Sequence, residues 1–263
     1  MNFLSARRLL AFLSLVLLLT LSADCQQVLL KYKFKAGDVS RYKETTHNEV
    51  TSEALPNGTQ KVLSQMYSTQ KVKKVNTDGT AQLVRTLDSA NTLLNGQPFD
   101  NPQTRTLVGI PIIVTVARTG NDFVDATVKQ AIATFRQQVM TQPSFPKTAI
   151  AMNRPWHDSA SYSQESPTGN ISTEIRFSTK LTGVDKISGL NAKVLERTLE
   201  LSGTIGNGTG TFKGTGKGNV YFSDILAKEI LSTITIDQSM EMVTPQGPMS
   251  TTMQVTSKKE LLR

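Results

Sequence analysis

Apolar and polar residues alternate with a period of two along most of this chain, and turn residues interrupt the pattern at short intervals. Residues 30–35 are the clearest case, with Leu30, Tyr32 and Phe34 in one phase and lysines in the other. This is the period of a β-strand that has one buried face. We therefore expect a half-buried strand at 30–35 and a chain built mainly from antiparallel strands.

Ten further segments carry strand patterns between glycine, proline, asparagine or aspartate turns. Asn76-Thr77-Asp78-Gly79 is a hairpin signal, because Asp-Gly accepts the positive φ angles of a tight turn. The glycine-rich stretch 203–218 lacks the spacing of a phosphate loop, and we interpret it as a flexible hairpin that feeds the strand around Val220. The expected strands are 40–50, 61–75, 80–88, 111–117, 159–165, 171–181, 192–201, 211–222, 229–238 and 248–261.

One segment has the period of a helix instead. Asp125 is a suitable N-cap, and Pro143 prevents the helix from continuing. The sequence predicts one amphipathic helix over about 125–141 that packs against the sheet. Its apolar face holds Val128, Ala131, Ile132, Phe135 and Val139.

The two halves of the chain resemble each other. Arg85-Thr86-Leu87 recurs as Arg197-Thr198-Leu199, and other short matches follow at a similar offset and in the same order. The fold we expect is mainly β with one helix (α+β): a large curved antiparallel sheet, either continuous or a duplicated half-barrel. It would form a single domain over 26–263, with related halves at about 28–120 and 152–263 joined by the helix.

Residues 1–25 have the pattern of an export signal. Two arginines precede an apolar run from Leu9 to Leu21, and small or polar residues follow it. The run has 13 residues by the printed sequence, whereas a membrane span needs about 20. We therefore expect an exported protein, periplasmic or extracellular, with no transmembrane span in the mature chain.

Cys25 is the only cysteine, and two outcomes are open for it. Lipidation would attach the chain to the outer membrane, but Asp24 fits a lipobox badly and Leu21 lies one position too early. Ordinary cleavage is the outcome we favour, either after Ala23 or before Gln26, and the cut before Gln26 would remove Cys25 with the signal. The mature chain then has no thiol chemistry and no disulfide.

Composition and motifs exclude several classes of function. The chain has a net charge of +8, but its basic residues are spread out rather than clustered, so we expect no nucleic-acid partner. The dispersed lysines suit a solvated strand face, and attraction to an anionic membrane is the alternative. His47 and His157 are the only histidines, and His157-Asp158-Ser159 places its groups in a row rather than around one point. We predict no catalytic residues, no metal site, no cofactor and no enzymatic activity.

Methionines are the remaining signal. Met240 and Met242 share one strand face, and Met249 and Met253 share the next. Flexible thioether side chains fill ordinary cores, but they also adapt to variable apolar ligands. If the methionines bind a ligand, we expect a site for an apolar or lipid molecule between the sheet and the helix. Its lining would be Met240, Met242, Met253, Phe135 and Ile132.

Two stretches resemble a family of exported bacterial proteins, many of them lipoproteins, whose function is not known. One is Leu30-Lys-Tyr-Lys-Phe-Lys-Ala-Gly-Asp with Tyr42 after it; the other is the ending, with Gly218-Asn-Val-Tyr-Phe, Ser232-Thr-Ile-Thr-Ile and Met253-Gln-Val-Thr-Ser-Lys-Lys-Glu-Leu. The layout is also similar to envelope lipoprotein carriers, in which a curved sheet covers a helix. The expected curved sheet and the methionines on its strands favour a non-enzymatic envelope protein that binds an apolar or lipid ligand. A structural or adaptor protein that engages another envelope protein is the alternative.

Overall fold

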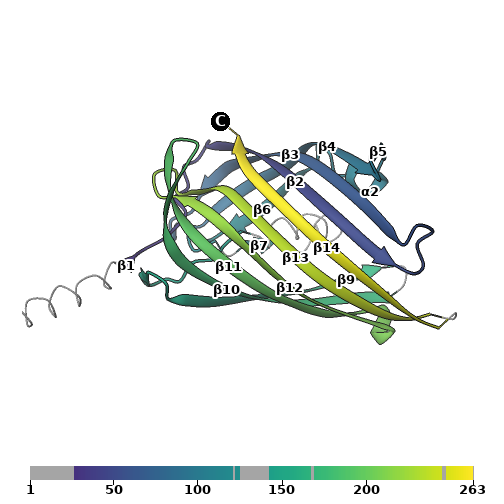
Figure 1. The fold of residues 1–263 in the computed structure, drawn as a ribbon. Helices are drawn as coiled ribbons and strands as arrows, with labels where there is room; N and C mark the ends of the chain where they lie inside the picture. Colours follow the sequence, from purple (N-terminus) through teal and green to yellow (C-terminus); the bar gives the residue numbers. More distant parts are fainter. Residues whose placement is uncertain (1–26, 121, 125–141, 167–168, 245–246, 263) are drawn as a thin grey trace, which may run out of the picture.

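The computed structural model describes residues 27–120, 122–124, 142–166, 169–244 and 247–262, and nearly all of their regular structure is antiparallel β-sheet (Figure 1). The export signal and the predicted helix at 125–141 lie outside these residues. The strands are β1 (Gln27–Val28), β2 (Val39–Ser52), β3 (Thr59–Val75), β4 (Ala81–Leu94), β5 (Gln97–Pro98), β6 (Pro111–Val116), β7 (Asp122–Val124), β8 (Ile150–Ala151), β9 (Pro155–Ser166), β10 (Gly169–Ile187), β11 (Leu190–Ile205), β12 (Gly210–Ser223), β13 (Lys228–Thr244) and β14 (Gly247–Leu262). Two short helical turns, α2 (Pro102–Arg105) and η2 (Gly206–Gly208), complete the described elements.

Twelve strands form one curved sheet, which confirms the predicted fold class. Their order is β7-β6-β4-β3-β2-β14-β13-β12-β11-β10-β9, with β5 against β4, and every pairing along this path is antiparallel. The last strand, β14, pairs with β2 and so joins two meanders of consecutive strands. Within the described residues, β7 and β9 are the two edges and do not pair with each other, so the sheet stays open.

The predicted internal repeat falls on corresponding places in the two meanders. Arg85 lies in β4, the third strand of the first meander, and Arg197 lies in β11, the third strand of the second. The leucine two residues later is buried in both strands. A duplication of the chain stays a prediction.

The strand predicted at 30–35 is wrong, although its alternation of buried and exposed residues is present. The segment is extended but pairs with no strand; the Tyr32 amide donates instead to the Arg118 carbonyl, at 2.8 Å. It crosses one end of the curved sheet, with Leu30 and Tyr32 buried and Lys33 and Lys35 exposed. An extended segment that crosses the end of the sheet also has one buried and one solvent-exposed face. Apolar and polar residues therefore alternate in it as they do in a strand, although it pairs with no strand. We call this end, where β2 and β13 begin, the plugged end, and the opposite end the far end.

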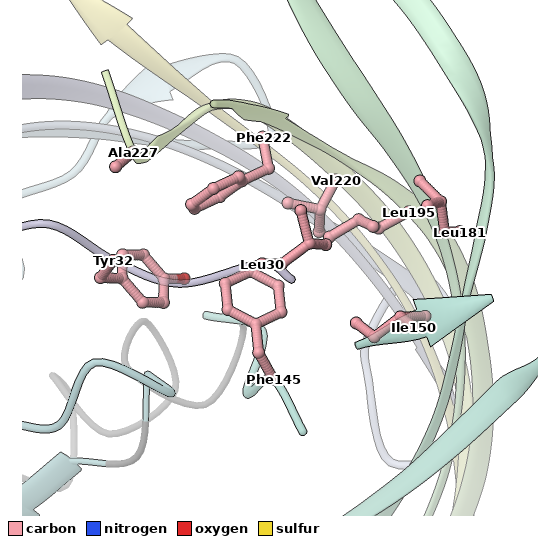
Figure 2. Packing of buried hydrophobic residues seen from close by; sticks show 9 residues of the cluster. All are labelled: Leu30, Tyr32, Phe145, Ile150, Leu181, Leu195, Val220, Phe222 and Ala227. Atoms are coloured by element: carbon pink, nitrogen blue, oxygen red, sulfur yellow. The ribbon is translucent and has the colours of Figure 1, made fainter. Parts of the chain in front are cut away.

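The main core lies under this crossing segment (Figure 2). Tyr32 packs against Phe145 and Phe222 with ring centroids 5.3 Å away in each case, and those two rings are 5.0 Å apart. The Tyr32 hydroxyl donates to the Pro143 carbonyl at 3.2 Å. The segment ahead of β2, the chain after the predicted helix and the strands of the second meander therefore meet here. The cluster consists of Leu30, Tyr32, Phe145, Ile150, Leu181, Leu195, Val220, Phe222 and Ala227.

Glycines inside β12 allow the sheet to bend. The predicted flexible hairpin at 203–218 is wrong in extent, because only Gly206–Gly208 forms the turn and the later glycines lie in a regular strand. A Cβ added at Gly218 would lie 2.0 Å from the Thr233 carbonyl oxygen, and one at Gly216 would lie 2.9 Å from that of Thr235. The backbone of β13 approaches this face of β12 too closely for side chains. Glycine is required there for the strong curvature between the two strands.

Candidate functional site

The buried clusters pack against the inner face of the sheet. The polarity of the side chains on this face changes along the strands. Residues directly opposite in an antiparallel pair share a face, so the register shows which side chains form transverse rows. Phe177, Leu199 and Ile234 form a buried apolar cluster midway along the strands. The transverse row through Phe177 and Leu199 is largely apolar and continues with Gly216, Ile236 and Val255.

The structure brings the methionines of β13 and β14 together on this inner face near the far end. Met242 lies directly opposite Met249, and Met240 lies opposite Thr251 on β14 and Phe212 on β12. Met253 lies opposite Gln238, one diagonal step from Met240. All four methionines are half-buried, unlike the closed core at the plugged end.

The other predicted lining residues cannot be placed beside these methionines. Phe135 and Ile132 belong to the helix predicted at 125–141 and lie outside the described residues, as does Cys25. A ligand role for Met240, Met242 and Met253 therefore stays a prediction, although their common face is observed.

Toward the plugged end the same inner face carries buried charges. Lys259 lies directly opposite Glu44, and its Nζ is 3.3 Å from Glu229 Oε2 and 4.8 Å from the centre of the Tyr42 ring. The Ser257 hydroxyl donates to Glu44 Oε1 at 3.2 Å. The side chain of Glu229 is 4% exposed and that of Lys259 18%, so these charges interact in a strongly reduced dielectric. We call Glu44, Glu229, Lys259 and Tyr42 the charged cluster.

The environment raises the pKa values of Glu44, Lys259 and Tyr42. Burial raises the pKa of Glu44, and the charge of Glu229 adds to this, whereas Lys259 and Ser257 oppose it. Burial alone would lower the pKa of Lys259, but Glu229, Tyr42 and Glu44 together raise it. Burial also raises the pKa of Tyr42. Lys259 thus stays charged, while ionisation of Glu44 costs more than it would in water.

A small enclosed cavity borders the charged cluster beneath the crossing segment. It measures about 30 Å³ and is lined in part by Tyr32, Tyr42, Gln70, Glu229 and Lys259. That volume admits one water-sized polar group. Among the described residues, Glu229 Oε1 has no hydrogen-bond partner, so a donor in this cavity would satisfy a buried acceptor.

Two buried arginines extend the polar region across the inner face. Arg85 donates from Nε to Gln70 Oε1 at 3.1 Å and from Nη2 to Gln142 Oε1 at 3.0 Å. The guanidinium of Arg197 lies 4.3 Å from the centre of the Phe177 ring. Burial lowers the pKa of Arg197, against the opposing charges of Glu229, Tyr32 and Asp158.

Sequence reasoning missed this polar region, although part of its signal was available. Arg85 stands in phase with Leu83 and Leu87, and Arg197 stands in phase with Leu195 and Leu199. A charged residue in the apolar phase of a strand indicates a buried, partnered charge. Lys259 could not be found in this way, because Lys258 and Glu260 place charges in the opposite phase as well.

The structure does not bring the histidines together with catalytic partners. His47 and His157 are exposed on strands β2 and β9, which lie at distant positions in the sheet. Asp158 accepts a hydrogen bond from the Ser144 hydroxyl. His157 is the preceding residue of β9, so its side chain points to the opposite face of the strand. In the described part of the chain, no three His, Cys, Asp or Glu side chains form a group able to hold a metal ion, and no helix has the length and hydropathy of a membrane span. The absence of enzymatic activity stays a prediction.

Comparisons with known proteins give limited likeness. No protein-family model and no curated protein matches the chain. Among solved structures, DynF from the dynemicin biosynthesis pathway of Micromonospora chersina is 6% identical, with a TM-score of 0.25, over 89% of this chain and 86% of its own. A protein from Bacteroides fragilis described as exported, with a YmcC-like fold, is 10% identical with a TM-score of 0.28, over 89% and 98% of the two chains. OccK5 of Pseudomonas aeruginosa is 8% identical with a TM-score of 0.24, over 86% and 99%. At such scores, these likenesses carry no argument about function.

Proposed function

We propose that this chain is an exported, non-enzymatic envelope protein that holds an apolar or lipid ligand on the inner face of its curved sheet. The observation that carries the proposal is the convergence of Met240, Met242, Met249 and Met253 on one half-buried patch of that face. Methionine side chains adapt to ligands of variable shape, and the concave side of a curved sheet is a common place for an apolar ligand.

The gradient along the inner face indicates how such a ligand would lie. Apolar rows run from Phe177 and Ile236 to the methionines at the far end, whereas the charged cluster and the packed core occupy the plugged end. An extended apolar body fits the first region, because burying its surface there gains about 25 cal/mol per Å². The buried charges would exclude it from the second.

The test is ligand analysis of the protein purified from its own host, by native mass spectrometry and lipid extraction. We expect a bound lipid or apolar molecule, and we expect Met242→Gln to weaken the binding of cis-parinaric acid as a fluorescent probe. Val243→Gln is the matched control, since Val243 is the next residue, points away from the inner face and is 73% exposed. Protein that carries no ligand and takes up no probe would contradict the proposal.

An adaptor protein that engages another envelope protein is the second candidate. The observation that favours it is a pair of adjoining open troughs of about 650 Å³ each along β2, β12, β13 and β14, which share Thr51 and Thr252. A partner that co-purifies in a fixed ratio and is lost on Thr252→Arg substitution would support this function. A monomer with bound lipid would count against it.

A further inference from the structure

We propose that the plugged end of the sheet docks on an anionic lipid surface, with Ile225 and Leu226 entering the interface and neighbouring lysines contacting the headgroups. The inference goes beyond ligand binding and does not depend on it. It rests on an exposed apolar turn, the basic residues around it and the place where the chain enters the described structure.

The apolar element is the turn between β12 and β13. Ile225 is 75% exposed and Leu226 is 36% exposed, although both are large aliphatic residues. The turn is held in place on either side, because the Leu226 amide donates to Ser223 Oγ at 3.3 Å and Ala227 is buried in the main core. Two aliphatic side chains presented on a fixed turn can enter a membrane interface at little entropic cost.

Basic residues lie beside this turn. Lys228 follows it directly, and its Nζ contacts Ser40 Oγ at 2.8 Å and Asp38 Oδ2 at 3.5 Å, which places the start of β2 next to the turn. Val39 on β2 is 52% exposed and lies directly opposite the exposed Lys71 on β3. We call this surface the docking rim; its exposed lysines are Lys33, Lys35, Lys71, Lys73 and Lys74.

The acidic residues near the docking rim do not cancel its positive charge. Asp38 is paired with Lys228 at 3.5 Å, and Asp224 is paired with Lys193 at 3.8 Å. Asp78 in the turn between β3 and β4 is a further acid, with its pKa lowered by hydrogen bonds from Thr80. The exposed lysines outnumber these acids, so an anionic surface is the complementary partner.

The chain also enters the described structure at this end. Gln27 begins β1, which lies at the left of Figure 1 and pairs with β8, whose Ile150 belongs to the main core. Cys25 precedes Gln27 by two residues in the sequence. A lipid on Cys25 would therefore tether the protein by the same end that carries the docking rim. Without that lipid, binding would depend on the buried apolar area of the turn and on the attraction of the lysines to anionic headgroups.

The first arm of the test follows the turn itself. The chain from Gln26 onward contains every described residue and no cysteine, so Ile225→Cys can be labelled with an environment-sensitive dye such as NBD. We expect a blue shift with vesicles of equal parts phosphatidylcholine and phosphatidylglycerol, little shift with pure phosphatidylcholine, and loss of the shift at high salt. Val243→Cys is the matched control, at 73% exposure near the far end. Equal shifts at both positions, or none at Ile225→Cys, would overturn the proposal.

The second arm measures vesicle flotation of two variants with the same change in net charge. Lys35→Gln with Lys71→Gln should weaken binding to the anionic vesicles roughly 25-fold, at about fivefold for each lysine. Lys213→Gln with Lys217→Gln, both on β12, should change it little. Equal losses in the two variants would show a net-charge effect without a docking surface. Binding of heparin by the docking rim without binding of vesicles would show a polyanion site, and either result would refute lipid docking.

Discussion

Replacing Lys259 with methionine would leave the buried carboxylate of Glu229 and the half-buried carboxylate of Glu44 without their cation. The Lys259 ammonium is 3.3 Å from Glu229 Oε2, which corresponds to an attraction of about 5 kcal/mol at an effective dielectric constant of about 20. Methionine keeps the apolar stem beside Tyr42 and ends the desolvation cost of the ammonium, so only part of this attraction is lost. We expect Lys259→Met to lower the free energy of unfolding by about 3 kcal/mol, the lower end of the range for a broken buried pair.

The loss of unfolding free energy caused by Lys259→Met should increase with pH. Without Lys259, the pKa of Glu44 rises further above its ordinary value of 4.5, since Lys259 is the main group that lowers it. A carboxyl whose pKa is raised by folding binds more protons in the folded state, so its contribution to stability is lost as pH rises above 4.5. The penalty of Lys259→Met should therefore be largest in alkaline buffer and should shrink toward about pH 4.5.

Urea unfolding followed by far-UV circular dichroism and by the fluorescence of Trp156, the only tryptophan, measures this effect. Lys258→Met is the matched control, because Lys258 is the adjacent residue in the opposite phase and its pair with Glu260 is solvent-exposed. Glu229→Gln combined with Lys259→Met should recover part of the loss. The assignment of a coupled buried cluster is wrong if Lys259→Met lowers the free energy of unfolding no more than Lys258→Met does. It is also wrong if the loss is the same in alkaline buffer as at about pH 4.5.

Two further outcomes test the fold. Gly218→Ala should destabilise the protein by about 2–3 kcal/mol in urea unfolding, because its Cβ would lie 2.0 Å from the Thr233 carbonyl oxygen. Gly183→Ala is the control and should be neutral in the same assay, since nothing lies within 4 Å of its added Cβ. In alkali the unmodified protein should lose stability as pH rises above 10.0 and then 10.5, the ordinary pKa values of Tyr42 and Lys259, because folding raises both. Circular dichroism on alkaline titration measures this loss, and a Tyr42→Phe, Lys259→Met chain that unfolds over the same range would contradict the reasoning.

Local pattern was sufficient for the strands and for most turns. The ten strands expected between residues 40 and 261 are all present, because alternation and turn chemistry act over a few residues. The same pattern misled at 30–35, where the wet and dry faces belong to a segment that crosses the end of the sheet. It also misled at Gly214, Gly216 and Gly218, where absent side chains reflect the close approach of β13 rather than flexibility.

The candidate site was predictable only in part. The shared face of Met240 and Met242 follows from the period of a strand, and so does that of Met249 and Met253. That all four methionines meet depends on the pairing of β13 with β14. The charged cluster depends on still longer contacts, since Lys259 meets Glu44 only because the last strand pairs with β2.

The sequence by itself determined the kind of protein: a chain of amphipathic strands in one β-rich fold, with an export-signal pattern ahead of it. The tertiary structure alone decided which strands became neighbours, which charges were buried and which end of the sheet was filled. The physical reason is the range of the interactions. Strand period and turn preference are properties of adjacent residues, whereas burial of Lys259, Glu229 and Arg197 results from segments far apart in the chain closing around them. A charge in a strand can face either side until the sheet has its curvature and the crossing segment is in place.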